Sequence, residues 1–115
     1  MALTLLEAKR CEQQLAAFLR RRRPPPRIRK QLDIGYELVN QSVELLEVRP
    51  DWRDNRKTVK TPIAKATYVR TQNIWRVYWM RRDFRWHAYQ PRPVVSDLVD
   101  FLETVDADQY GCFFG

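Results

Sequence analysis

Glycine is scarce in this sequence, with only three copies among 115 residues. A glycine-rich loop that holds phosphates needs several glycines, because the backbone must approach the ligand with no side chain in the way. The sharp turn that presents a catalytic serine in many hydrolases also depends on small residues. Neither motif occurs in the chain, so the sequence predicts neither kind of site.

Histidine and cysteine are also few. His87 is the only histidine, and Cys11 and Cys112 lie at opposite ends of the chain. A zinc site takes three or four such ligands, which the chain does not offer at suitable spacing. We therefore expect no metal and no cofactor, and we expect both cysteines to be buried, reduced thiols.

Long hydrophobic runs are missing as well. No stretch approaches the roughly 18 to 20 apolar residues that a membrane-spanning helix needs. The first residues, Met1 to Glu7, lack both the basic and the long apolar segment of a secretory signal. The sequence thus predicts a soluble, cytoplasmic protein with no membrane partner.

Charge is plentiful but unevenly distributed. The chain has 21 basic and 14 acidic residues, which gives a net charge of +7. Residues 1–30 hold nine of the basic and two of the acidic residues, so they account for the whole excess. In the remainder the charges balance, because acidic segments at 31–48 and 93–115 flank a basic segment at 49–92. These segments could simply neutralise one another within the fold.

Length and composition predict a single α+β domain over residues 1–115. A chain of this size can bury roughly 65% of its unfolded surface, which suffices for a core without metal or disulfide. The first predicted element is a helix over Leu5–Arg22, with Thr4 and Glu7 as a capping box and Pro24 shortly after its end. The stripe at helical spacing that we expect to face the core consists of Ala8, Cys11, Leu15, Phe18, Leu19 and Arg22.

Alternating apolar and polar residues then predict an antiparallel meander of about five strands. The apolar phase slips between Leu45 and Leu46, which predicts a bulge. A polar, mobile loop is expected over Asp51–Lys60. The predicted strands are Leu32–Leu38, Val43–Val48, Thr61–Arg70, Ile74–Met80 and Phe84–Tyr89.

A short C-terminal helix is predicted after Ser96, which we expect to cap it with its side chain. Leu98, Phe101, Leu102 and Val105 would point inward from this helix. The last six residues, 110–115, are too apolar to extend into water. This apolar tail is therefore expected to pack on the core or to add a strand.

Several motifs are distinctive in combination. They are Asp33-Ile-Gly-Tyr36, Glu47-Val-Arg-Pro-Asp-Trp52, Ile63-Ala-Lys-Ala66, Trp75-Arg-Val-Tyr-Trp79, Arg82-Asp-Phe-Arg-Trp-His-Ala-Tyr89 and Asp108-Gln-Tyr-Gly-Cys-Phe-Phe-Gly115. Over nearly its whole length the chain resembles the bacterial family known as domain of unknown function family 3024. That resemblance implies no activity, cofactor or catalytic residue, so function has to be argued from the residues.

The segment 20–30, RRRRPPPRIRK, is the first candidate site, and we call it the basic arm. Each basic side chain that neutralises a phosphate releases condensed counterions, so such a segment favours binding of nucleic acid or another polyanion. The alternative is a capped helix end followed by a solvated proline linker. The arm contains Arg20, Arg21, Arg22, Arg23, Arg27, Arg29 and Lys30.

The second candidate lies in the middle of the predicted sheet. Alternation places Arg76 and Tyr78 on one face of their strand, and it places Arg85, His87 and Tyr89 together on the next. If all five share an exposed face, they form a basic surface with aromatic rings that could stack unpaired bases. The alternative is an ordinary solvated face, with the two helices covering the other side.

Other motifs favour structural roles. His87 could act as a general base oriented by Asp83, Asp108 or Glu47, although a lone histidine beside tryptophan is more typical of a structural residue. A metal-dependent nuclease motif would need an acid two positions before Lys65, where Ile63 stands. Trp75 and Trp79 fit core packing, whereas Trp52 in its polar loop is the tryptophan expected at the surface.

Three functional hypotheses follow. The first is a non-enzymatic accessory protein that binds RNA, DNA or another polyanion through the basic arm and the sheet face. The second is a protein-interaction module that recognises an acidic protein partner. The third is an enzyme that uses His87.

Overall fold

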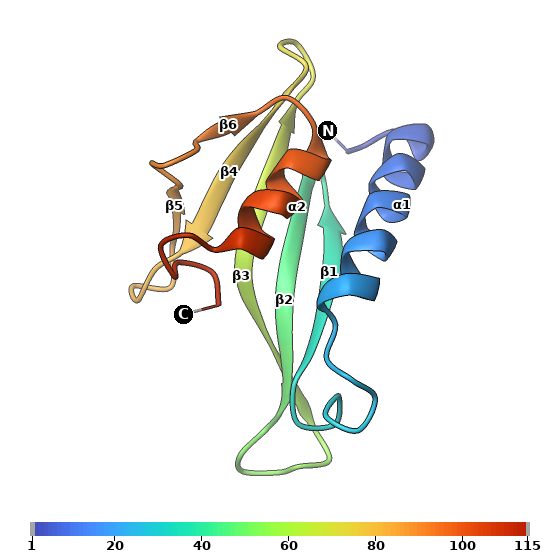
Figure 1. Ribbon diagram of the computed structural model, residues 1–115, viewed down its shortest axis with the longest axis vertical. Coiled ribbons are helices and arrows are strands. Elements are labelled where there is room, and N and C mark those ends of the chain that lie inside the picture. Colours follow the sequence, from blue (N-terminus) through green and yellow to red (C-terminus); the bar gives the residue numbers. More distant parts are fainter. Residues whose placement is uncertain (1, 115) are drawn as a thin grey trace.

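The structure, a computed structural model, describes residues 2–114. Met1 and Gly115, at the ends of the predicted domain and tail, lie outside the described residues. The predicted α+β architecture is confirmed, with an N-terminal helix, an antiparallel sheet and a short C-terminal helix (Figure 1). The elements are α1 (Leu5–Arg22), β1 (Asp33–Val39), β2 (Ser42–Pro50), β3 (Thr58–Val69), β4 (Ile74–Met80), β5 (Trp86–Ala88), β6 (Val94–Val95) and α2 (Leu98–Ala107).

The sheet is the meander that the alternating pattern predicts. Strands β1 to β5 pair in sequence order, each antiparallel to the next. The short strand β6 was not predicted, and it pairs with Trp75 and Arg76 of β4. Strands β5 and β6 thus share β4 as a neighbour, with β5 pairing to Tyr78, Trp79 and Met80.

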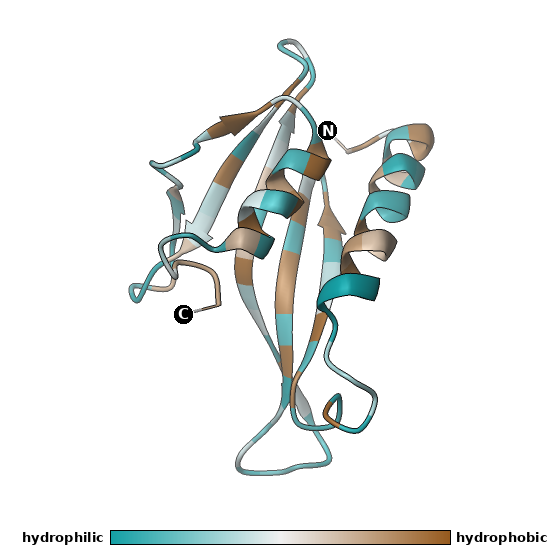
Figure 2. Ribbon diagram, viewed as in Figure 1, coloured by the Kyte–Doolittle hydropathy of each residue, from teal (hydrophilic) through white to brown (hydrophobic). Residues whose placement is uncertain are grey.

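Both helices lie on the same face of the sheet (Figure 1). Cys11, Leu15 and Phe18 of α1 pack there with the buried residues of α2. The strands contribute the residues that alternate toward this side, and Figure 2 shows hydrophobic segments along the strands and hydrophilic loops below. The buried strand residues of this core are Ile34, Val43, Leu45, Ile63, Ala64, Ala66, Trp75, Val77 and Val95.

Helix α1 begins as the sequence predicts. The Thr4 hydroxyl accepts the backbone N–H of Glu7 at 3.2 Å, and the Glu7 carboxylate accepts the backbone N–H of Thr4 at 2.8 Å. Glu7 also binds the Arg70 guanidinium at 2.7 Å, which ties the helix to the end of β3. Arg70 and the backbone N–H of Thr4 together lower the pKa of Glu7 to about 2.

The predicted bulge is present at the expected place. Leu45 pairs with Ala64, but Leu46 pairs with Pro62, so Ile63 of β3 is the extra residue. The bulge lets two consecutive residues be buried on each strand. Leu46 is buried outside the core that the helices cover.

Several boundaries differ from the predictions, and the largest differences are at the β2–β3 loop, at the start of β5 and at the cap of α2. Strand β2 extends to Pro50 and strand β3 begins at Thr58, so the loop between them is shorter than expected. Strand β5 begins at Trp86, because Phe84 lies in a turn with φ of 59° and donates its N–H to Arg81 at 2.9 Å. The cap of α2 is Asp97 rather than Ser96, and the Ser96 hydroxyl binds Asp100 instead.

The tail packs on the core and adds no strand among its described residues. The Asp108 carboxylate accepts the backbone N–H groups of Phe113 at 3.0 Å and Phe114 at 2.9 Å. Phe113 is buried with its ring 4.9 Å from that of Tyr89. The first of the two predicted placements of the tail is therefore correct.

Two further expectations can be compared with the structure. Cys11 and Cys112 are both free thiols, but only Cys11 is fully buried and Cys112 is half-buried. Within the residues described, no helix combines the length and the hydrophobicity that crossing a membrane requires.

Truncation of a core ring should cost far more stability than truncation of an exposed one. Phe101 of α2 is fully buried, so Phe101→Ala should lower the free energy of unfolding by about 3 to 5 kcal/mol in a urea titration. Phe84 is 84% exposed, and Phe84→Ala should change it by less than about 0.5 kcal/mol. Equal losses in the two variants would contradict this placement of the core.

The pairing of Glu7 with Arg70 should be visible in an acid titration. Its folded pKa of about 2 lies below the ordinary value of 4.5, so the pair contributes stability above pH 4.5 and loses that contribution as the pH falls toward 2. In Arg70→Gln, the midpoint of the Glu7 carboxyl carbon signal in an NMR titration should rise toward 4.5. The same midpoint in Arg92→Gln should match the wild type, and a rise there would contradict the assignment.

Candidate nucleic-acid interface

The basic arm is folded rather than extended. Arg20 to Arg22 form the last turn of α1, and Arg23 is its C-cap. After the three prolines the chain turns back, because the N–H of Ile28 binds the carbonyl of Pro25 at 2.9 Å and that of Gln31 binds Ile28 at 2.8 Å. The arm is therefore a helix end followed by a hydrogen-bonded turn that leads into β1.

Three basic residues of the arm hold the fold together. The Arg22 guanidinium lies 4.1 Å from the centre of the Phe114 ring and 3.8 Å from Asp106. Arg23 makes two hydrogen bonds to Asp33, at 2.8 and 2.7 Å, and this pairing lowers the pKa of Asp33. Arg29 donates to the carbonyl of Pro24 at 2.8 Å. These side chains have structural contacts, so they are less available for a ligand.

The other four basic residues of the arm point to solvent. Arg20, Arg21, Arg27 and Lys30 are exposed, and they make no ion pair within residues 2–114. Arg21 makes one weak hydrogen bond, at 3.4 Å, to a carbonyl of its own helix. These four residues carry the part of the arm's charge that a ligand can reach.

The loop between β2 and β3 lies beside the turn of the arm. Pairing of Asp33 with Val48 brings the end of the arm next to the end of β2, and both segments lie at the lower end of the molecule in Figure 1. Gln31 and Trp52 line one shallow groove of about 580 Å³. The loop itself is closed by the N–H of Asp51, which binds the carbonyl of Lys57 at 2.9 Å.

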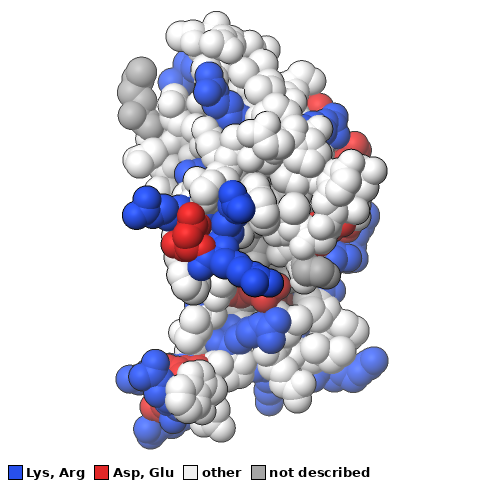
Figure 3. Space-filling model, turned by 90° about the vertical axis from the view of Figure 1, so that its left-hand side faces the viewer, with Lys and Arg blue, Asp and Glu red and all other residues white. Residues whose placement is uncertain are grey.

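We call this surface, formed by residues 24–32 and 49–57, the basic end. It holds seven basic and two acidic residues. Arg49 is paired with Glu47 at 3.2 Å and Arg56 with Asp54 at 3.0 Å. Figure 3 shows lysine and arginine gathered around the lower end of the molecule, with few acidic side chains between them. The bases here without an ion pair among the described residues are Arg27, Arg29, Lys30, Arg53 and Lys57.

Trp52 is the tryptophan of the basic end. Its side chain is 88% exposed, as the sequence predicts for this tryptophan. The Arg53 guanidinium lies 5.2 Å from the centre of its ring. A large exposed aromatic ring among cations is the combination that single-stranded nucleic acids use for stacking.

The five sheet residues do not form one surface, which corrects the second candidate site. Tyr78 pairs with Ala88 and Trp79 with His87, so His87 lies on the helix-covered face while Arg76 and Tyr78 lie on the open face. Tyr89 is only 2% exposed against Phe113, and this burial raises its pKa. Arg85 precedes β5 and lies in the turn. The predicted alternation within each strand is correct. The turn between β4 and β5, however, sets which residues of the two strands lie side by side.

The open face carries a different aromatic and basic set. Lys65 of β3 lies 4.9 Å from the ring centres of both Tyr78 and Trp86. Desolvation by these neighbours lowers the pKa of Lys65, and Glu44 opposes the shift. Lys65 pairs with Glu44 across the strands, and Lys60 binds Glu37 at 3.3 Å. Charges of both signs therefore alternate over this face.

His87 has the acidic partner that the catalytic hypothesis requires. Its Nε2 lies 2.8 Å from the carboxylate of Asp83, and Asp83 also accepts the backbone N–H of Arg85 at 3.0 Å. The imidazole lowers the pKa of Asp83. All three residues belong to the β4–β5 hairpin, so the contact fixes this turn. Residues 2–114 contain no group of three or more histidine, cysteine or acidic residues placed to hold a metal ion.

The loop between β2 and β3 contributes basic residues that neither predicted site included. Arg49, Arg53, Arg56 and Lys57 were not assigned to a site, although four basic residues within nine positions surround Trp52. The signal was thus present in the chain. What was missing was the proximity of this loop to the arm, which depends on the pairing of β1 with β2.

The fold and this surface define a small α+β domain with a helix-covered meander and a basic end. Residues 3–115 match the family described as "Domain of unknown function (DUF3024)". The chain belongs to this family, which confirms the resemblance. No curated protein and no solved structure matches it.

The arm's basic residues should separate into two groups when their effect on stability is measured. Arg22→Gln combined with Arg23→Gln should lower the free energy of unfolding by about 1 to 2 kcal/mol, because the Phe114 and Asp33 contacts are lost. Arg20→Gln combined with Arg21→Gln removes the same charge and should cost less than about 0.5 kcal/mol. Urea titration of both double variants tests this, and equal costs would contradict the division.

Proposed function

We propose that this protein is a non-enzymatic accessory protein that binds single-stranded RNA or DNA through its basic end. The observation that carries the proposal is the position of Trp52, which is 88% exposed, lines a groove with Gln31 of the arm and has the Arg53 guanidinium 5.2 Å from its ring centre. Trp52 makes no contribution to the core, and an exposed ring beside a guanidinium suits a stacking site. A ligand with flat, unpaired bases gives the ring a function.

Electrostatic affinity would come from the bases that have no acidic partner. Arg27, Lys30, Arg53 and Lys57 can each approach a phosphate without breaking an ion pair. Neutralising a phosphate releases counterions, so affinity should depend steeply on salt. Stacking on Trp52 adds a contribution that duplex nucleic acid, with its bases paired inside, cannot provide.

The basic end supports this function better than the open sheet face does. Lys60 on that face is already bound to Glu37, and Lys65 lies opposite Glu44. A phosphate there would meet carboxylates beside each lysine. We therefore place the principal contact at the basic end and retain Arg76 and Tyr78 only as a secondary contact. Two free thiols agree with the cytoplasmic location that this function implies.

Fluorescence anisotropy with short labelled single-stranded RNA, single-stranded DNA and duplex DNA tests the proposal. Binding of the single strands should weaken strongly between about 50 and about 200 mM salt. Trp52→Ala should weaken it a further 5- to 100-fold, on the order of one lost stacking interaction. Arg27→Gln combined with Lys30→Gln should reduce the salt slope by about 1.4, because two phosphate contacts are removed.

Matched controls use the β4–β5 turn, which contributes no residue to the basic end. Phe84→Ala removes an aromatic ring of similar exposure, and Arg81→Gln combined with Arg82→Gln removes the same charge from the β4–β5 turn. Both should bind as the wild type does. If the controls and the basic-end variants lose affinity equally, binding is unspecific charge attraction. If no nucleic acid binds at near-physiological salt, the proposal is wrong and an acidic protein partner becomes the better hypothesis.

A further inference from the structure

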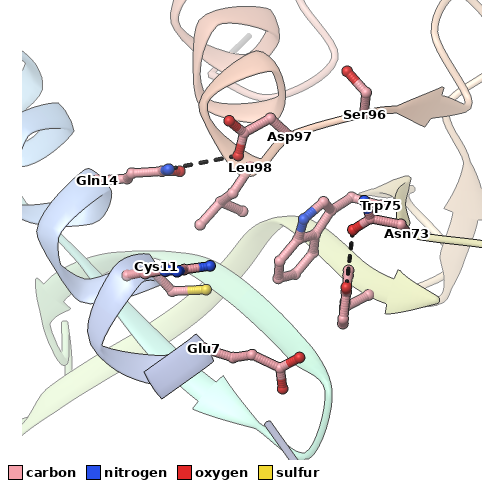
Figure 4. A pocket seen from close by; sticks show the side chains of 10 residues that line it. Glu7, Cys11, Gln14, Asn73, Trp75, Ser96, Asp97 and Leu98 are labelled. Carbon is pink, nitrogen blue, oxygen red and sulfur yellow. Dashed lines mark hydrogen bonds between the residues drawn. The ribbon is translucent and has the colours of Figure 1, made fainter. Parts of the chain in front are cut away.

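A polar pocket lies on the helix-covered side, between α1, the β3–β4 hairpin and the start of α2 (Figure 4). Its volume is about 460 Å³. Cys11, Trp75 and Leu98 form its apolar part, and each is less than a tenth exposed. The pocket is far larger than one water molecule, so it can hold a small organic ligand.

Gln14 and Asp97 meet in the wall of this pocket. The Gln14 Nε2 donates to Asp97 at 3.5 Å, and Figure 4 shows these two side chains facing each other. The ionised carboxylate can only accept, so this long contact favours the amide orientation in which Nε2 faces Asp97. The Gln14 Oε1 is buried and has no hydrogen-bond partner among the described residues. A buried acceptor of this kind is costly unless a donor reaches it.

The two acidic side chains that line the pocket differ in availability, because Glu7 is paired with Arg70 whereas Asp97 has no ion pair among residues 2–114. Burial raises the pKa of the Cys11 thiol to about 11, and the carboxylates of Glu7, Asp97 and Glu12 add to the shift. Arg10 is the one basic residue among the described residues that line the pocket, and it is exposed at the rim. The positive end of the α2 dipole also meets acids, since Asp97 caps this helix and Asp100 lies in its first turn.

Two aromatic rings complete the site. Tyr68 and Trp75 both line the pocket, with ring centres 5.0 Å apart. The Tyr68 hydroxyl donates to the side-chain oxygen of Asn73 at 3.0 Å, which holds the tyrosine in place. Aromatic faces beside acceptors and carboxylates attract cations that carry N–H donors. Anions would be repelled by Asp97, and neutral apolar ligands would leave the Gln14 oxygen unpaired.

We propose that this pocket binds a small organic cation with an ammonium or guanidinium head group on an apolar stem. The head group donates to the Asp97 carboxylate and, after the Gln14 amide rotates, to its buried Oε1, and the stem lies against Trp75. This site is separate from the basic end, since it is built from other residues and has the opposite charge preference. The proposal therefore does not depend on nucleic-acid binding.

Nitrogen-15 NMR on the full chain tests the site with n-butylguanidinium chloride, n-butylammonium chloride, n-butanol and inorganic phosphate as probes. At least one cation should shift the Gln14 side-chain amide and the Trp75 indole signals, with a dissociation constant on the order of millimolar for so small a ligand. Butanol and phosphate should not shift them comparably. The stronger of the two cations identifies the preferred head group.

The variant Asp97→Asn keeps a residue that favours helix N-termini but removes the charge, and it should weaken cation binding roughly fivefold. Glu103→Gln removes the same charge from an exposed position of α2 outside the pocket, and it should bind as the wild type does. Equal weakening in both variants would mean unspecific attraction to acidic surface. Shifts by butanol as large as those by the cations, or no shift at Gln14, would overturn the proposal.

Discussion

Burial of one sheet face beneath α1 and α2 is the interaction on which the other features of this protein depend. Val43, Leu45, Ala66 and Val77 are fully buried there because alternate residues of paired strands point to the same side. Removing this apolar surface from water supplies the main stabilisation. The same burial fixes which residues face outward. It thereby gives the protein an open sheet face, and it leaves a polar pocket where the two helices separate.

The basic side chains of this protein fall into two groups, those with structural contacts and those exposed to solvent. Arg22, Arg23 and Arg70 join the helices and the tail to the sheet through Phe114, Asp33 and Glu7. Their partners belong to segments distant in the sequence, which is how acidic segments neutralise part of the basic excess. Arg27, Arg29, Lys30, Arg53 and Lys57 have no ion pair among the described residues, and they lie with Trp52 at one end of the sheet. A net charge of +7 is thus a poor guide to the ligand surface until the paired residues have been set aside.

Much of the fold follows from local patterns. The capping box at Thr4 defines where α1 begins, since both of its hydrogen bonds join residues three apart. The phase slip at Leu45 and Leu46 locates the bulge, because period two has to break where consecutive residues are buried. Local patterns failed at Ser96 and Phe84. Ser96 binds Asp100, so the neighbouring residue is the helix cap. Phe84 donates its N–H to Arg81, so it lies in a turn and not in the strand.

The sequence alone determined the α+β class, the sheet order and the exposure of Trp52, because periodicity and polarity act over a few residues. Tertiary structure alone decided which bases are available and which aromatic residues share a face. His87 and Arg76 lie on opposite faces because the turn between β4 and β5 sets the register of the strands. The arm lies beside the Trp52 loop, and Gln14 contacts Asp97. In both cases the residues are too far apart along the chain for a local sequence pattern to predict the contact.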